Sequence, residues 1–248
     1  MNNKLLVSLM SIGLVATVVG VGTYAYFSDT ETSTGNTVTA GVLDLSFSGE
    51  STFHLVDLKP SYNLQTDNIQ LRFVENPGKV YKKITSVICT PKAEAVDPRD
   101  KYCAISDNWP ILQAYLAGLG STYKVTDATT CKAAPMMDAM WFDLTLGETT
   151  VIADGAVGLN GLMGKWIYLG YYAPFVHGDQ TKYAEVNLKQ SFHLMNSVDN
   201  WAQGQTCTFN EEYLLLQDNA PAPGNCVNPA GLQGKDNHVG GTTCPDAL

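Results

Sequence analysis

Alternation of apolar and polar residues along most of the chain after residue 41 predicts β-strands that each bury one face. The clearest case is residues 184–194, where one face is apolar and the other is polar: Ala184, Val186, Leu188, Phe192 and Leu194 against Glu185, Asn187, Lys189, Ser191 and His193. Related patterns predict strands at residues 42–47, 69–73, 80–89, 141–146, 149–153, 165–172 and 206–217. Short strands without a regular alternation with helices favour an antiparallel sandwich or barrel.

Two parts of this β region carry more specific predictions. The sequence Glu75-Asn76-Pro77-Gly78 predicts a tight turn, because proline fixes φ and glycine tolerates positive φ. Residues 68–89 are therefore expected to form a strand pair across that turn. Residues 165–172 are apolar on both faces, which predicts a central strand covered on both sides.

Two regions interrupt the β pattern. Residues 90–140 are expected to form a helical insertion, with a short helix between Pro110 and Gly118. Its shared apolar face is predicted to carry Ile111, Leu112, Tyr115, Leu116 and Leu119. Residues 218–248 are rich in Pro, Gly and Asn and have few large apolar side chains, so they predict a loop-rich tail.

The first 25 residues have the organisation of a secretory signal. Lys4 precedes an apolar run, and Thr23 and Ala25 stand at −3 and −1 of a predicted cut between Ala25 and Tyr26. The alternative is an uncleaved anchor, because about 20 apolar residues span a bilayer. Glycines dilute the run and no basic cluster follows it, so cleavage is favoured. The protein is therefore expected to be secreted and to work outside the cell or at its surface.

All six cysteines lie in the predicted exported part: Cys89, Cys103, Cys131, Cys207, Cys226 and Cys244. An even number of cysteines in an exported chain predicts disulfide bonds. The first candidates are the pairs close in sequence, Cys89–Cys103 and Cys226–Cys244. The formal charge of −9, without basic clusters, argues against nucleic acid as a partner.

No familiar catalytic motif is present. HExxH, GxSxG and a phosphate-binding loop are all missing, and His54, His177, His193 and His238 are interpreted as surface or hydrogen-bonded residues. Glu211 and Glu212 are neighbours on a predicted strand and should point to opposite faces, so they should not act together. We therefore expect no enzymatic activity, no metal site, no cofactor and no small-molecule substrate.

The segment that follows the predicted cut can form a strand. Residues 26–40 are rich in threonine and include the β-forming residues Tyr26, Phe27, Thr37, Val38 and Thr39. A terminal strand of this kind can pair with its own sheet or with the open edge of another molecule. The residues alone leave both alternatives open.

The junction GVGTYAYFSDTETSTGNTVTAGVLDL resembles the start of the TasA/camelysin family. The matching residues are Gly22, Thr23, Tyr24, Ala25, Tyr26, Phe27, Ser28, Asp29, Thr39, Ala40, Gly41, Leu43, Asp44 and Leu45. Residues 58–60 with 73–78, and residues 200–217, are more weakly similar to two later motifs. The 90–140 insertion, the cysteines and the tail depart from the bacterial pattern and are similar to the archaeal bundling-pilus branch.

The resemblance implies a jelly-roll sandwich over residues 42–217 with an insertion at about 90–140. A donor-strand segment, residues 26–41, would precede it, and a disulfide-pinned tail, residues 218–248, would follow. In that family each subunit's N-terminal segment completes the sheet of its neighbour, and the fibres bundle in biofilm matrix. Here the interface would include Tyr26, Phe27, Thr37, Val38, Thr39 and Val42, with other copies and other filaments as partners.

Two further functions stay open. One is a monomeric cell-surface adhesin whose first strand folds back on its own sheet. The other is a camelysin-like surface metallopeptidase, although no zinc-ligand set is recognisable in the sequence.

Overall fold

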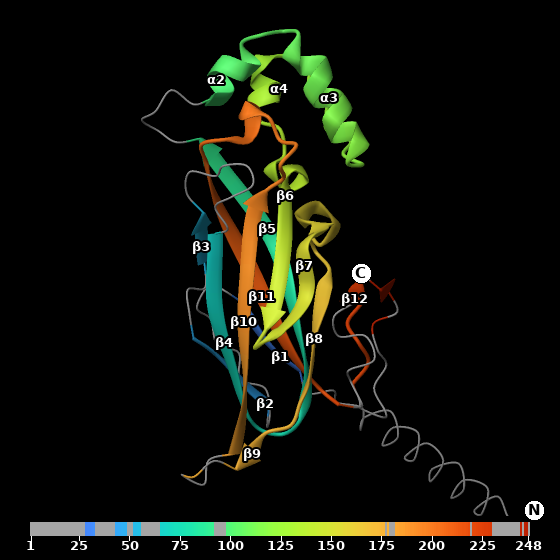
Figure 1. Ribbon diagram of the computed structural model, residues 1–248. Coiled ribbons are helices and arrows are strands. Elements are labelled where there is room, and N and C mark those ends of the chain that lie inside the picture. Colours follow the sequence, from blue (N-terminus) through green and yellow to red (C-terminus); the bar gives the residue numbers. More distant parts are fainter. Residues whose placement is uncertain are drawn as a thin grey trace, which may run out of the picture.

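The computed structural model describes residues 28–32, 43–48, 52–55, 65–91, 98–176, 178, 182–218, 220–229, 244 and 246–247. Within them, two β-sheets pack face to face into an elongated sandwich, and short helices lie across one end (Figure 1). The chain is therefore mainly β, as the alternation predicts. No helix in this part of the chain is long and apolar enough to cross a membrane.

We call the first sheet sheet A. Its strands run in the order β1 (Ser28–Thr32), β11 (Gln205–Gln217), β5 (Gly78–Pro91), β8 (Trp166–Tyr172), β12 (Cys226–Asn228) and β13 (Asp246–Ala247), and β3 (Thr52–Leu55) also pairs with β11. The pairs that β12 forms with β8 and β13 are parallel, and the other pairs of sheet A are antiparallel. The predicted central strand at residues 165–172 is β8, which lies inside the sheet between β5 and β12.

The second sheet, sheet B, is antiparallel throughout. Its order is β2 (Leu43–Ser48), β4 (Gln65–Glu75), β10 (Lys182–Leu194), β6 (Met140–Leu146) and β7 (Thr149–Gly158), and β9 (Phe175–Val176) pairs with the start of β10. Each strand that the alternation predicts lies within, or overlaps, a strand of one of the two sheets.

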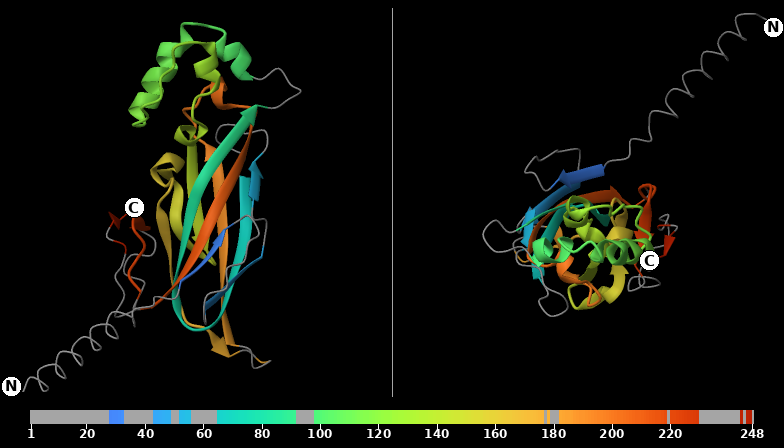
Figure 2. Two further views of the ribbon diagram at one scale, coloured as in Figure 1. Left: turned by 180° about the vertical axis from the view of Figure 1, so that it is seen from behind. Right: turned by 90° about the horizontal axis from the view of Figure 1, so that it is seen from above.

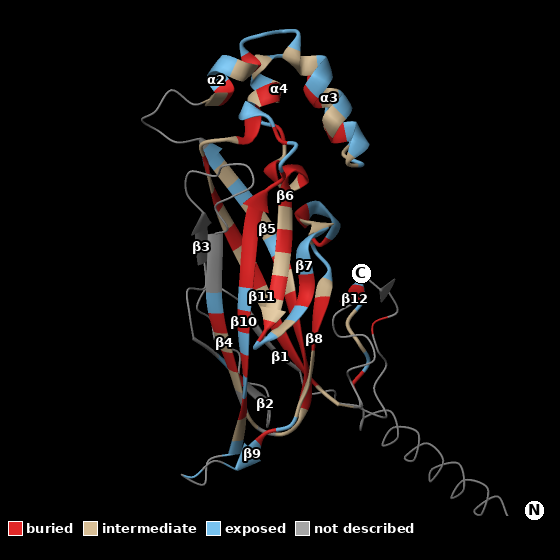
Figure 3. Ribbon diagram, in the orientation of Figure 1, coloured by how far each residue is buried: buried red, intermediate tan, exposed pale blue. Residues whose placement is uncertain are grey.

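The core lies between the inner faces of the two sheets. Phe192 on β10 packs against Phe142 on β6, with ring centroids 5.1 Å apart, and against Phe209 on β11, at 4.1 Å. The three rings are 0–1 % exposed, so they join sheet B to sheet A through fully buried aromatic contacts. Figure 3 shows buried residues recurring along β6, β10 and β11.

The predicted strand pair at residues 68–89 is wrong in its pairing. A tight turn does separate β4 from β5, but β4 hydrogen-bonds to β2 and β10 whereas β5 hydrogen-bonds to β11 and β8. The turn therefore carries the chain from sheet B to sheet A. Gly78 is needed there because a Cβ at this position would lie 2.7 Å from both Leu215 Cδ1 and the carbonyl oxygen of Leu216.

The insertion forms a helical cap at one end of the sandwich (Figures 1 and 2). It contains α2 (Pro98–Cys103), α3 (Asn108–Gly118), α4 (Ala128–Lys132) and a 3₁₀ turn at Met136–Ala139. Leu112 and Leu116 of α3 are buried as predicted, but Ile111 is 57 % exposed, so its place on the apolar face was wrong. The cap touches the sandwich through Tyr115, whose ring meets that of Trp201 edge-on at 6.4 Å.

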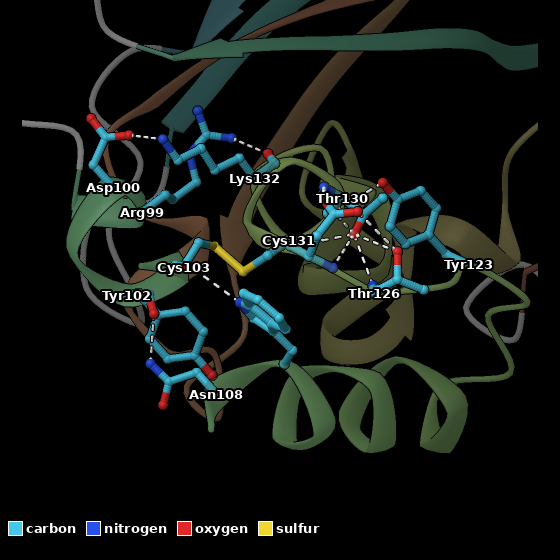
Figure 4. The surroundings of a disulfide bond; sticks show 12 residues. Arg99, Asp100, Tyr102, Cys103, Asn108, Tyr123, Thr126, Thr130, Cys131 and Lys132 are labelled. Carbon is cyan, nitrogen blue, oxygen red and sulfur yellow. Dashed lines mark hydrogen bonds and ion pairs between the residues drawn. A yellow bond between two sulfur atoms is a disulfide. The ribbon is translucent and has the colours of Figure 1, made fainter. Parts of the chain in front are cut away.

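The cap is also held together from within (Figure 4). A disulfide joins Cys103 at the end of α2 to Cys131 in α4. Arg99 donates a hydrogen bond to the carbonyl oxygen of Lys132 at 2.7 Å, and the Lys132 ammonium pairs with Asp100. These contacts fix α2 against α4.

The other two disulfides are Cys89–Cys207 and Cys226–Cys244. The predicted pair Cys226–Cys244 is confirmed, and the predicted pair Cys89–Cys103 is wrong. Cys89 of β5 and Cys207 of β11 are direct register partners, which is why they bond across 118 residues of sequence. Cys226–Cys244 pins the tail, which is not only loop because it contributes β12 and β13 to sheet A.

Candidate functional site

One edge of β11 is covered by two short strands that lie end to end. β3 pairs with Cys207–Asn210, and β1 pairs with Glu212–Leu216 in an antiparallel register that sets Ser28 opposite Leu216 and Thr32 opposite Glu212. β1 belongs to the segment that the sequence predicts as a terminal strand. In this chain, residues 28–32 therefore occupy the outer edge of sheet A.

The strand that receives β1 is buried on both faces. Tyr213 and Leu215 point into the core between the sheets and are 2 % and 0 % exposed. Leu214 and Leu216 point the other way, into a small apolar cluster that includes Tyr81 and the tail residues Ala220, Cys226 and Cys244. Without β1, backbone N–H and C=O groups along this edge of β11 would lack hydrogen-bond partners, which costs free energy. A row of such unpaired groups can accept another strand.

The two halves of the β11 edge meet at an irregularity in the sheet. The register between β11 and β5 shifts between Asn210 and Glu211, where the cover changes from β3 to β1. Glu211 turns into the core and forms an ion pair with Lys82, while Glu212 turns outward and pairs with Lys83. The prediction that the two glutamates point to opposite faces is confirmed.

The inward pair is part of a buried polar network. Lys82 Nζ donates to the Tyr213 hydroxyl at 3.1 Å, and that hydroxyl donates to Glu211 Oε2 at 2.7 Å. Gln190 of sheet B also donates to Glu211 Oε2, at 3.3 Å. The network therefore connects the two sheets beside the point where β1 begins to cover β11.

The predicted interface and cleavage residues lie outside the described residues: Ala25, Tyr26, Phe27, Thr37, Val38, Thr39 and Val42. Their predicted roles stay predictions. The described part of the predicted donor segment is Ser28–Thr32, and none of these residues is among the predicted contact residues.

A second cluster lies on the outer face of sheet B, where Asp143 of β6, Asp154 of β7 and His193 of β10 come together. His193 Nε2 is 2.8 Å from Asp154 Oδ1, and His193 Nδ1 is 3.7 Å from Asp143 Oδ1. Burial raises the pKa of the Asp143 carboxyl, while a hydrogen bond from Ser191 and the charge of His193 oppose that rise. The ligand atoms of the three residues lie within 4.8 Å of one another.

Sequence reasoning missed this cluster. It placed His193 on the polar face of its strand, which is right, but that end of the face is buried rather than exposed. The three residues come from three different strands, and their spacing in the sequence matches no known metal-binding motif. Of the four histidines, His193 is the one whose side chain the structure describes beside two carboxylates.

Residues 1–97 match the model of a family described as Camelysin metallo-endopeptidase. No curated protein and no solved structure matches the chain. The description implies a metal ion, and a histidine with two carboxylates is a donor set that fits a divalent cation. That donor set belongs to residues 143–193, outside the matched part. The matched part contains the predicted signal, the predicted donor segment and β1 to β5. Over residues 1–97, the chain is therefore similar to the camelysin family.

Proposed function

We propose that this protein is exported and forms a structural subunit of an extracellular filament, in which the N-terminal segment of one copy completes sheet A of the next. The observation that carries the proposal is the place of β1. This five-residue strand follows closely after the predicted cleavage point. It is the edge strand of sheet A and pairs with β11, which is buried on both faces there. The three disulfides support a role outside the cell, because such bonds persist in oxidising surroundings.

The pairing of β1 with β11 is made by backbone groups, so it does not depend on which copy supplies β1. The same residues from a second copy would fit the same register on Glu212–Leu216. Exchange of an identical element between copies is domain swapping, and a head-to-tail exchange that does not close on itself produces a filament. Removal of the signal would free the segment, so processing would precede assembly.

We also propose that the sandwich is a jelly roll. In sheet A the strands β1, β11, β5 and β8 are neighbours, and in sheet B the strands β4, β10, β6 and β7 are neighbours. Along the chain, consecutive strands from β1 to β11 alternate between the sheets, except that β6 and β7, and β9 and β10, stay in sheet B. That alternation is the connectivity of two interleaved Greek keys.

Deletion of residues 26–39 tests the filament role. We expect the processed protein to form filaments in negative-stain electron microscopy and the truncated protein to form none. A peptide of residues 26–42 should bind the truncated protein in its place, whereas a scrambled peptide should not. Filaments made by the truncated protein would reject the donor-strand role. A processed protein that stays monomeric in light scattering would instead favour the adhesin, with β1 kept on its own sheet.

The proposed role requires no catalysis, although the family description names a peptidase. Incubation of the purified protein with casein, with and without a chelator, separates the two functions. We expect no chelator-sensitive cleavage. Such cleavage would assign the protein to the surface metallopeptidases, and substitution of His193 would then show whether the cluster on sheet B is responsible.

A further inference from the structure

The cluster on sheet B is built by an irregularity in β7. Phe142 of β6 pairs with Val157 and Leu144 pairs with Ile152, so residues 153–156 of β7 lie opposite the single residue Asp143. Gly155, inside this bulge, has a φ of +71°, a value that glycine adopts without strain. Bulges of this kind redirect a side chain, and here Asp154 reaches past β6 to His193 on β10.

Two of the facing atoms have no hydrogen-bond partner within the described structure. The His193 side chain is 7 % exposed, and its Nδ1 faces Asp143 Oδ1 at 3.7 Å; neither atom has a hydrogen bond. Buried polar atoms without partners are uncommon, and an ion that fills the space between them is one reason for their presence. Asp154 is 67 % exposed, so the cluster is open to solvent on that side.

We propose that Asp143, Asp154 and His193 bind a single divalent transition-metal ion of the zinc class. Two carboxylates supply negative charge, and the imidazole favours zinc-class ions over Ca²⁺ and Mg²⁺, which prefer oxygen ligands. Ligands about 2.1 Å from a tetrahedral ion lie roughly 3.4 Å apart, close to the 3.7 Å that separates His193 Nδ1 from Asp143 Oδ1. The carboxylate of Asp154 lies at the other ring nitrogen of His193, so this exposed side chain would turn away from Nε2 to reach the same ion. Ser191, which hydrogen-bonds to Asp143, would orient that ligand from the next layer.

The bound ion would fasten the edge of sheet B. Among the described strands, β7 is the last on that side of the sheet, after β10 and β6. A metal held by one residue from each of these three strands would keep the bulged edge closed. The site involves neither β1 nor β11, so it is independent of the proposed subunit exchange.

Isothermal titration of the purified, disulfide-bonded protein near neutral pH tests the site. We expect a single Zn²⁺ to bind, to raise the melting temperature, and to bind more tightly than Ca²⁺ or Mg²⁺. Asp154→Asn should weaken Zn²⁺ binding by more than about tenfold, because even partners of a metal ligand are worth roughly 10–100-fold. Glu148→Gln is the matched control, since it removes an exposed acidic group in the turn beside β7 and should leave binding unchanged.

His193→Gln should abolish the Zn²⁺-dependent rise in melting temperature, and circular dichroism will show whether that variant folds. If His193→Gln does not fold, Asp154→Asn still tests the site, because the Asp154 side chain is mostly exposed and its replacement should not disturb folding. Absence of Zn²⁺ binding, equal binding by Asp154→Asn and the parent protein, or binding of Ca²⁺ as tight as that of Zn²⁺ would each overturn the assignment. The filament assay is unaffected by all three results.

Discussion

The ion pair between Lys82 and Glu211 should stabilise the sandwich only as a pair. Both side chains are almost fully buried, at 0 % and 1 % exposure. Removal of one partner leaves the other as an uncompensated charge in the core, which costs about 3–5 kcal/mol. Replacement of both by apolar residues of similar size is often neutral, because the cost of removing both charges from water disappears with the pair.

The test is a double-mutant cycle of Lys82→Met, Glu211→Leu and the double variant. We expect each single variant to lose about 3–5 kcal/mol of unfolding free energy and the double variant to lose less than either. Urea unfolding with the disulfides intact gives these values, provided that the slope of free energy against urea is the same for each variant.

The neighbouring pair Lys83 and Glu212 supplies the control. It joins the same two strands on the outer face, where the side chains are 21 % and 26 % exposed. Partial exposure lets water screen the charges, so Lys83→Met should cost no more than about 1 kcal/mol. Equal losses from the two lysine substitutions, or additive losses from Lys82→Met and Glu211→Leu, would refute the reasoning.

Three further predictions concern stability. Gly78→Ala should lower the unfolding free energy by about 1–3 kcal/mol in urea, because the added methyl group meets β11. The control is Gly118→Ala, whose methyl group meets nothing within 4 Å and should not cost this much. Equal losses from the two substitutions would contradict the close approach at Gly78. Burial raises the pKa of Tyr172 from 10.0 to about 12, so the unfolded chain loses this proton first and stability falls by about 1.4 kcal/mol per pH unit between those values. Tyr172→Phe should reduce that slope in unfolding measured across alkaline pH, and an unchanged slope would rule this residue out as its source. Joint replacement of Cys103 and Cys131 by alanine should cost about 2–4 kcal/mol and make the cap an early target in limited proteolysis, and an unchanged cleavage rate would show that the disulfide does not hold it.

Sequence alternation predicted the strands well because the two faces of a strand follow from neighbouring residues alone. The inward face of β10, with Val186, Leu188 and Phe192, is an example. The same pattern does not say which sheet a strand joins, so the turn at Gly78 was interpreted as a hairpin rather than a crossing between sheets. Cys89 was assigned to a near neighbour for a similar reason, because its register with Cys207 depends on the whole sandwich.

The candidate sites divide in the same way. A strand within residues 26–40 was predictable because the threonine-rich composition of the segment is a local feature, although the strand described, Ser28–Thr32, contains none of the β-forming residues named in the prediction. The cluster of Asp143, Asp154 and His193 was not, because it requires the order of three strands and a bulge in one of them. The opposite orientation of Glu211 and Glu212 followed from alternation, but the inward partner Lys82 did not, since the pairing of β5 with β11 is a long-range feature.

The most direct test of the subunit exchange asks which copy supplies β1. Thr32 and Glu212 are register partners, and the native cysteines described in the structure are all in disulfides, so one new cysteine on each of two separate variants reports a contact between copies. Thr32→Cys and Glu212→Cys proteins are mixed, polymerised, oxidised and separated on a non-reducing gel. Thr32→Cys mixed with Lys124→Cys, whose new thiol lies in the cap, is the control. Subunit exchange predicts a covalent dimer from the first mixture and none from the control. A single chain that carries both new cysteines is tested beside them. If the filaments give no dimer and the double-cysteine chain forms its disulfide only within itself, β1 stays on its own sheet.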